Sequence, residues 1–211
     1  MKKLHAVALL AALCGCHCAP DTGTKTELSI HNAQTVDATA YIAFGADSKI
    51  TSDAWAFCEG SGLNCSFNVP AGGTVPLPNP DGKYINLTVA FNDPVGCGVT
   101  KAEVDANNPD WYDTMDVSLV DGYSNNVEIV YTAPGEVPVS YGPPKGAEGN
   151  QDLVGVFPYG CDICVARQNP PCGIDKGTEG CKAGTQYDPH PPCQAQGKTK
   201  GGGGTIEIVL K

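Results

Sequence analysis

The sequence predicts an all-β protein, folded as an antiparallel β-sandwich. Apolar and polar residues alternate in several short stretches between residues 26 and 132, most clearly from Ile85 to Phe91. Turn sequences such as Asn79-Pro80-Asp81-Gly82 separate these stretches, and no segment carries a convincing helical stripe. Several short strands at regular spacing are typical of a sandwich.

The individual strands follow from this two-residue period, because side chains alternate between the faces of an extended chain. The period is seen at Leu28 and Ile30, Tyr41 and Ala43, Phe67 and Val69, Ile85 to Phe91, and Val127 to Tyr131. A last strand is predicted at Thr205 to Leu210, after a run of four glycines at 201–204. We therefore assign residues 26–132 and 205–211 to one sandwich.

The most informative stretch runs from Asp116 to Tyr123. Val117 and Leu119 should face the core, and Asp116 should face the opposite side. An unpaired Asp121 on the apolar face would be costly, so the chain should turn there, with Gly122 permitting the turn. We expect a hairpin that joins this strand to Val127–Tyr131.

Residues 133–204 have a different composition. Prolines and glycines from Pro134 to Gly146 indicate a linker, and residues 158–200 hold five cysteines with little apolar periodicity. Such a segment cannot fold on hydrophobic burial alone. We expect a linker and a disulfide-rich loop lobe, inserted before the last strand.

The N-terminus has the pattern of an export signal over residues 1–15. Lys2 and Lys3 precede about ten apolar residues, a run too short to span a bilayer. Leu13-Cys14-Gly15-Cys16 resembles a bacterial lipobox, which predicts lipidation of Cys16 and a tether over residues 16–25. The expected location is the outer membrane or cell surface, attached by the lipid only; simple secretion is the alternative.

Charge limits the partners. Removal of residues 1–15 would leave 11 basic and 23 acidic side chains, a net charge of −12. Such a surface repels nucleic acid and anionic lipid, so neutral or cationic partners are expected. We expect a monomer.

Eight further cysteines predict a disulfide framework in an exported chain. They are Cys58, Cys65, Cys97, Cys161, Cys164, Cys172, Cys181 and Cys193. The local pair Cys58–Cys65 is favoured, and the other pairings stay open. The Cys161-x-x-Cys164 spacing could also suggest zinc, but it has no second closely spaced pair, and we predict no metal and no cofactor.

Four segments resemble the thaumatin-like family. Asp110-Trp111-Tyr112-Asp113, followed after two residues by Asp116 to Tyr123, is similar to a specific family motif. Ala102-Glu103-Val104 resembles the segment that precedes that motif. Glu27 to Asn32 is similar to the first strand of the family, and Asn68 to Gly73 to one of its turns.

The resemblance implies an acidic cleft between the sandwich and the disulfide-rich lobe. By matching positions the cleft would contain Glu103, Asp116 and Asp121, with further ligand contacts from Trp111, Tyr112, Asp113 and Tyr123. The family's cleft arginine cannot be placed, because Arg167 is the only arginine and lies in the second lobe. The family's late cleft aspartate has no counterpart motif.

These residues support three hypotheses. Carboxylates accept strong hydrogen bonds from sugar hydroxyls, so the first is binding of a neutral polysaccharide such as β-1,3-glucan, or of a cell-surface glycan. The second is weak endo-β-1,3-glucanase activity, with Glu103 as proton donor and Asp116 or Asp121 as its partner. The third is a protein-interaction or inhibitor module that uses residues 158–193. Equally, aspartates at turns can satisfy backbone N–H groups, and the aromatic side chains can be packing residues.

Overall fold

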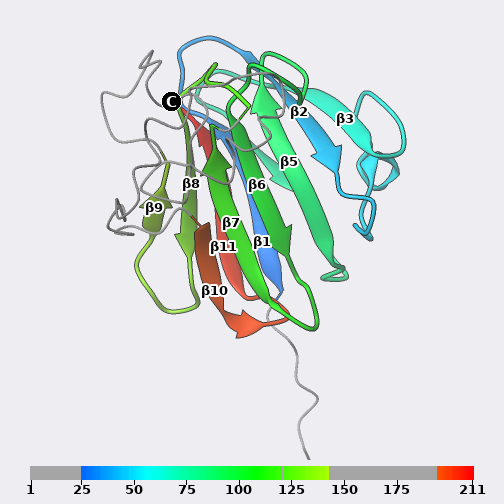
Figure 1. Ribbon diagram of the computed structural model, residues 1–211, viewed down its shortest axis with the longest axis vertical. Helices are drawn as coiled ribbons and strands as arrows, with labels where there is room; N and C mark the ends of the chain where they lie inside the picture. Colours follow the sequence, from blue (N-terminus) through cyan, green and yellow to red (C-terminus); the bar gives the residue numbers. More distant parts are fainter. Residues whose placement is uncertain (1–24, 120, 143–193) are drawn as a thin grey trace, which may run out of the picture.

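The computed structural model describes residues 25–119, 121–142 and 194–211, and these form two packed β-sheets (Figure 1). The first sheet has the order β4-β1-β11-β8-β9, and the second has the order β10-β7-β6-β5-β2-β3. All neighbouring strands are antiparallel except β1 and β11, which are parallel. The predicted all-β sandwich is therefore confirmed.

The strands of the first sheet are β1 (Thr26–Asn32), β4 (Thr74–Leu77), β8 (Val127–Thr132), β9 (Val139–Tyr141) and β11 (Gly204–Leu210). Those of the second are β2 (Ala38–Phe44), β3 (Asn64–Val69), β5 (Ile85–Phe91), β6 (Lys101–Ala106), β7 (Tyr112–Ser118) and β10 (Gln194–Lys200). A short 3₁₀ helix, η1 (Ser52–Ala54), lies between β2 and β3.

The core lies between the sheets and follows the predicted alternation except on β2. There Ala40 and Ile42 are buried, and the predicted pair Tyr41 and Ala43 lies on the opposite face of the strand. Ile85, Leu87 and Phe91 on β5 are at most 1% exposed, and they meet apolar residues of the opposite sheet such as Ile206 and Ile208 on β11. The residues between them on β5 and β6 face outward and are mostly polar. The second sheet therefore presents a polar outer face.

The predicted hairpin between the segments now seen as β7 and β8 is wrong. β7 pairs with β6 and β10, whereas β8 pairs with β11 and β9 in the other sheet. Both hydrogen-bonding edges of β7 are thus occupied, and residues 119–126 carry the chain from one sheet to the other. The expected turn at Gly122 is present: its φ is +151°, and its N–H donates to the Leu119 carbonyl at 3.2 Å.

Two strands, β9 and β10, come from the region for which the sequence predicted a linker and a loop lobe. β10 adds to the outer edge of β7, and a turn through Gly201–Gly203 leads from it into β11. The local period did not reveal β10, because its sequence Gln-Ala-Gln-Gly-Lys-Thr-Lys is nearly all polar.

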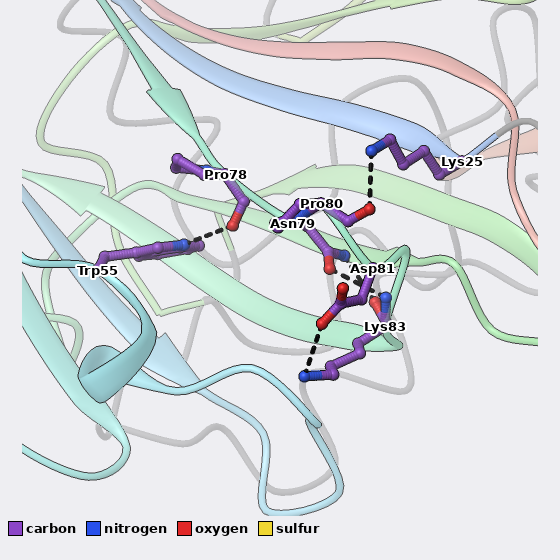
Figure 2. A network of polar contacts seen from close by, with 7 residues as sticks. All are labelled: Lys25, Trp55, Pro78, Asn79, Pro80, Asp81 and Lys83. Atoms are coloured by element: carbon purple, nitrogen blue, oxygen red, sulfur yellow. Dashed lines mark hydrogen bonds and ion pairs between the residues drawn. The ribbon is translucent and has the colours of Figure 1, made fainter.

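The turn between β4 and β5 is held by hydrogen bonds within the turn and from two side chains outside it (Figure 2). The Asn79 side chain accepts from the Lys83 N–H at 2.9 Å and donates to the Lys83 carbonyl at 2.7 Å. The Trp55 indole N–H donates to the Pro78 carbonyl at 2.8 Å, and Lys25 donates to the Pro80 carbonyl at 2.9 Å. This predicted turn is confirmed, and it leads the chain into Tyr84 and β5.

The predicted Cys58–Cys65 disulfide is present and ties the loop after η1 to β3. Cys97 is also disulfide-bonded. The signal segment, the tether, Cys16 and the cysteines from Cys161 to Cys193 lie outside the described residues. Within the described ranges, no helix has the length and apolar character that a membrane crossing needs.

Candidate functional site

The candidate site lies on the outer face of β5, β6 and β7. Glu103 on β6 is directly opposite Asp116 on β7, and Thr88 on β5 is opposite Glu103 from the other side. In the next row Asp105 lies between Asn86 and Thr114. Directly opposed residues have Cβ atoms about 5 Å apart, so these side chains can interact.

These residues surround a hollow of about 220 Å³. It is lined by Asn86, Leu87, Thr88, Glu103, Val104, Asp105, Thr114 and Asp116. A larger hollow of about 440 Å³ lies between β1 and the loop around Pro78, but none of the predicted site residues lines it. Two of the predicted site residues, Glu103 and Asp116, therefore line the smaller hollow.

Burial and a neighbouring carboxylate favour the protonated form of Asp116. Burial, with only 9% of the residue exposed, and then the adjacent Glu103 carboxylate raise the pKa of Asp116 to about 8. In this form Asp116 donates a hydrogen bond to Glu103. Burial also raises the pKa of Glu103, while the Lys101 ammonium and the hydrogen bond from Asp116 oppose that shift. The two groups form a proton-sharing pair.

Two carboxyl oxygens at the hollow are buried without a hydrogen-bond partner. They are Oδ1 of Asp116 and Oδ1 of Asp105. A buried acceptor without a donor costs free energy, so both oxygens favour a ligand that brings donors. Asp105 also contacts the Tyr84 hydroxyl, whose oxygen lies 3.2 Å from Oδ2 of Asp47 and which has one proton for these two carboxylates.

Asp121, the third predicted acid, is not among the residues that line this hollow. It forms a largely buried ion pair with Lys101, one place along the outer face of β6 from Glu103. Sequence reasoning looked for an arginine and missed Lys101. The sequence did contain a signal for Lys101. It lies two residues before Glu103, and residues two apart on a strand share a face.

Asp113 lies on the opposite side of β7, in the interior. Its carboxylate accepts from the Thr26 hydroxyl and from the Asn107 N–H, the latter at 2.8 Å. Thr26 Oγ1 in turn accepts from the Gly203 N–H at 2.6 Å. Asp113 thus joins the start of β1, the β6–β7 turn and the turn before β11, and is not brought together with Glu103 and Asp116.

The predicted aromatic residues lie at the two ends of the outer face of β5, β6 and β7. Trp111 is 52% exposed and meets Tyr112 edge to face at 5.8 Å between ring centroids. The Lys200 ammonium lies 5.8 Å from the Trp111 ring. Tyr123, half-buried, follows Asp121 at the other end.

Among residues 25–119, 121–142 and 194–211, no group of three or more histidine, cysteine, aspartate or glutamate side chains is arranged to hold a metal ion. Thr88, Thr114 and Asn86 instead add hydroxyl and amide groups around the acid pair. The site is suited to an organic ligand rich in hydrogen-bond donors.

No family model and no curated protein match the chain. Among solved structures, the chain is similar to that of the thaumatin-like xylanase inhibitor TLXI, with 11% identity and a TM-score of 0.44. The match covers 87% of this chain and 97% of that one. A likeness at this level carries no argument about function, so the function of this chain has to be inferred from its own residues.

Proposed function

We propose that the outer face of β5, β6 and β7 binds a neutral polysaccharide such as β-1,3-glucan, or a cell-surface glycan of similar chemistry. The observation that supports this is the Glu103–Asp116 pair, set in a polar hollow beside acceptor oxygens that lack donors. Sugar hydroxyls supply such donors, and hydrogen bonds to ionised carboxylates are stronger than neutral ones. Thr88 and Thr114 can both donate to and accept from ring hydroxyls.

The same pair argues against the hydrolase alternative. Glycoside hydrolysis needs a carboxylic acid and a carboxylate about 5 to 9.5 Å apart, with the sugar between them. Glu103 and Asp116 instead share one hydrogen bond, which leaves no room for a scissile bond between them. Asp121, the other candidate partner, is held by Lys101. The third hypothesis, protein interaction through residues 158–193, concerns residues outside those described.

Sedimentation with insoluble β-1,3-glucan tests this proposal. Glu103→Gln keeps the shape of the side chain but removes the charge, so we expect binding about tenfold weaker than that of the unmodified protein. Asp53→Asn, an exposed acid on η1, is the matched control and should bind like the unmodified protein. Equal binding by Glu103→Gln, or no binding by any form, would refute the proposal.

Release of reducing ends from the same glucan tests the alternative. Prolonged incubation should leave the substrate intact. Release that disappears in Glu103→Gln would instead favour the hydrolase.

A further inference from the structure

The hollow beside Glu103 is short of positive charge. The Lys101 ammonium lowers the pKa of Glu103, but Lys101 is already paired with Asp121. The groups that act on Asp105 and Asp116 are Tyr84, Asp47 and Glu103, which are hydroxyl or acidic groups. Three carboxyl groups therefore line one small hollow, and the Lys101 ammonium, which acts on Glu103, is already paired with Asp121.

The carboxyl groups of Asp116 and Asp105 each have one oxygen without a donor. Oδ1 of Asp116 and Oδ1 of Asp105 are both buried and unpartnered, and both residues line the hollow. Asp116 is only 9% exposed, so water compensates its carboxyl group poorly. A neutral hydroxyl would satisfy one such acceptor, whereas an ammonium group has three donors and a charge.

We propose that this hollow holds the protonated amine of an amino sugar, so that the site prefers a chain of glucosamine units with free amines over a neutral or N-acetylated chain. The inference rests on the proposed carbohydrate-binding function and specifies the sugar class for the same site. The hollow, at about 220 Å³, is smaller than the ~300–1,000 Å³ typical of drug-sized ligand sites, so it suits one sugar unit of a longer chain.

Binding of the amine is coupled to loss of a proton. Without ligand, the protonated Asp116 carboxyl group donates a hydrogen bond to Glu103. When the ammonium group enters, it replaces that donor, and the Asp116 proton passes to the buffer. The bound state then contains an Asp116 carboxylate beside the ligand ammonium, with up to one proton released per site. A neutral sugar brings no charge and releases none.

Calorimetry of the full chain at about pH 6 tests this coupling, because both Asp116 and the amine carry protons there. The probes are glucosamine oligosaccharides, their N-acetylated matches and β-1,3-glucan oligosaccharides of equal length, each in two buffers of different ionisation enthalpy. We expect the free-amine chain to bind about tenfold more tightly than the others. Its apparent enthalpy alone should depend on the buffer.

Two variants separate charge from shape. Asp116→Asn removes the titrating proton, so it should lose the preference for the amine and the buffer dependence. Asp105→Asn should reduce the preference but keep the proton release. The control Asp53→Asn should behave like the unmodified protein.

The outcomes distinguish the two proposals. Equal affinity for amine and N-acetyl chains without proton release, alongside intact glucan binding, overturns this inference and leaves the proposed function standing. Amine binding with proton release but no glucan binding supports the cation site and refutes the neutral-ligand proposal. Absence of binding to all three probes overturns both.

Discussion

Lys101 and Asp121 form an ion pair across 20 residues of sequence, and both side chains are largely buried. The pair links the start of β6 to the connection that leaves β7. It therefore fixes one end of the outer face on which Glu103 and Asp116 lie. It also fixes the position of the Lys101 ammonium, the only cation among the described residues that is found to lower the pKa of Glu103.

Lys101→Met should destabilise the protein by about 3 kcal/mol or more, because Asp121 would be left buried without its cation. Denaturation in urea measures this change. Lys198→Met is the matched control: its ion pair with Glu136 is exposed, and its loss should cost less than about 1 kcal/mol. Equal effects in the two variants would contradict the importance of burial for the first pair.

Asp116 should make the stability of the protein fall as pH rises. Its folded pKa of about 8 is raised above the ordinary value of about 3.9, so the folded chain holds this proton more tightly than the unfolded chain. Its contribution is fully present below about pH 4 and is lost as pH rises through about 8. Urea denaturation at pH 5 and pH 9 should show the fall.

Asp116→Asn removes the titrating group, and the fall in the free energy of unfolding between these two pH values should become smaller. Asp53→Asn should retain the fall seen in the unmodified protein. An identical fall in Asp116→Asn would assign the pH dependence to other groups, of which Asp113 and Asp105 also have raised pKa values because of burial.

The local sequence predicted the sandwich and the face of β7 on which Asp116 lies. Alternation places Val117 and Leu119 inside and Asp116 outside, and the structure confirms this. Alternation depends only on the chain's own geometry and burial, so it can be seen without knowing the neighbouring strands.

Pairing partners were predicted less well. The segments of β7 and β8 are close in sequence and separated by turn residues, which favours a hairpin, yet they lie in different sheets. The deciding contacts come from β10 and β11, which are distant in sequence. The roles of Lys101 and Asp113 depend on the same distant contacts, since their partners are Asp121 and Thr26.

Gly122→Ala should be strongly destabilising. A Cβ at this position would lie 2.3 Å from the carbonyl carbon of Gly98, and φ is +151°. Backbone cannot move aside as a flexible side chain can, so we expect a loss of at least about 2 kcal/mol in urea denaturation. Gly72→Ala has a φ of +65° but no atom within 4 Å, so it should cost only about 1 kcal/mol.

Thr26→Val should lower stability and leave glycan binding unchanged. The hydroxyl of Thr26 donates to Oδ2 of Asp113 and accepts from the Gly203 N–H, and valine would remove both of these hydrogen bonds in the interior. We expect a loss of about 2 to 3 kcal/mol, measured by urea denaturation. Weaker sedimentation with glucan by the folded variant would show instead that the interior network around Asp113 takes part in binding.

Trp111→Ala should weaken binding of long chains more than binding of short ones. Tyr112 is four residues along β7 from Asp116, a distance of about 13 Å, so only a chain of several sugars can reach both the hollow and the Trp111 ring. The ring is 52% exposed, so its removal should change stability by less than about 0.5 kcal/mol. Loss of one aromatic contact of about 1 kcal/mol corresponds to about fivefold weaker binding. Calorimetric titration with oligosaccharides of increasing length measures this effect. Leu63→Ala, also exposed, is the control and should bind normally. If Trp111→Ala weakens all lengths equally, the ring does not form a separate subsite along β7.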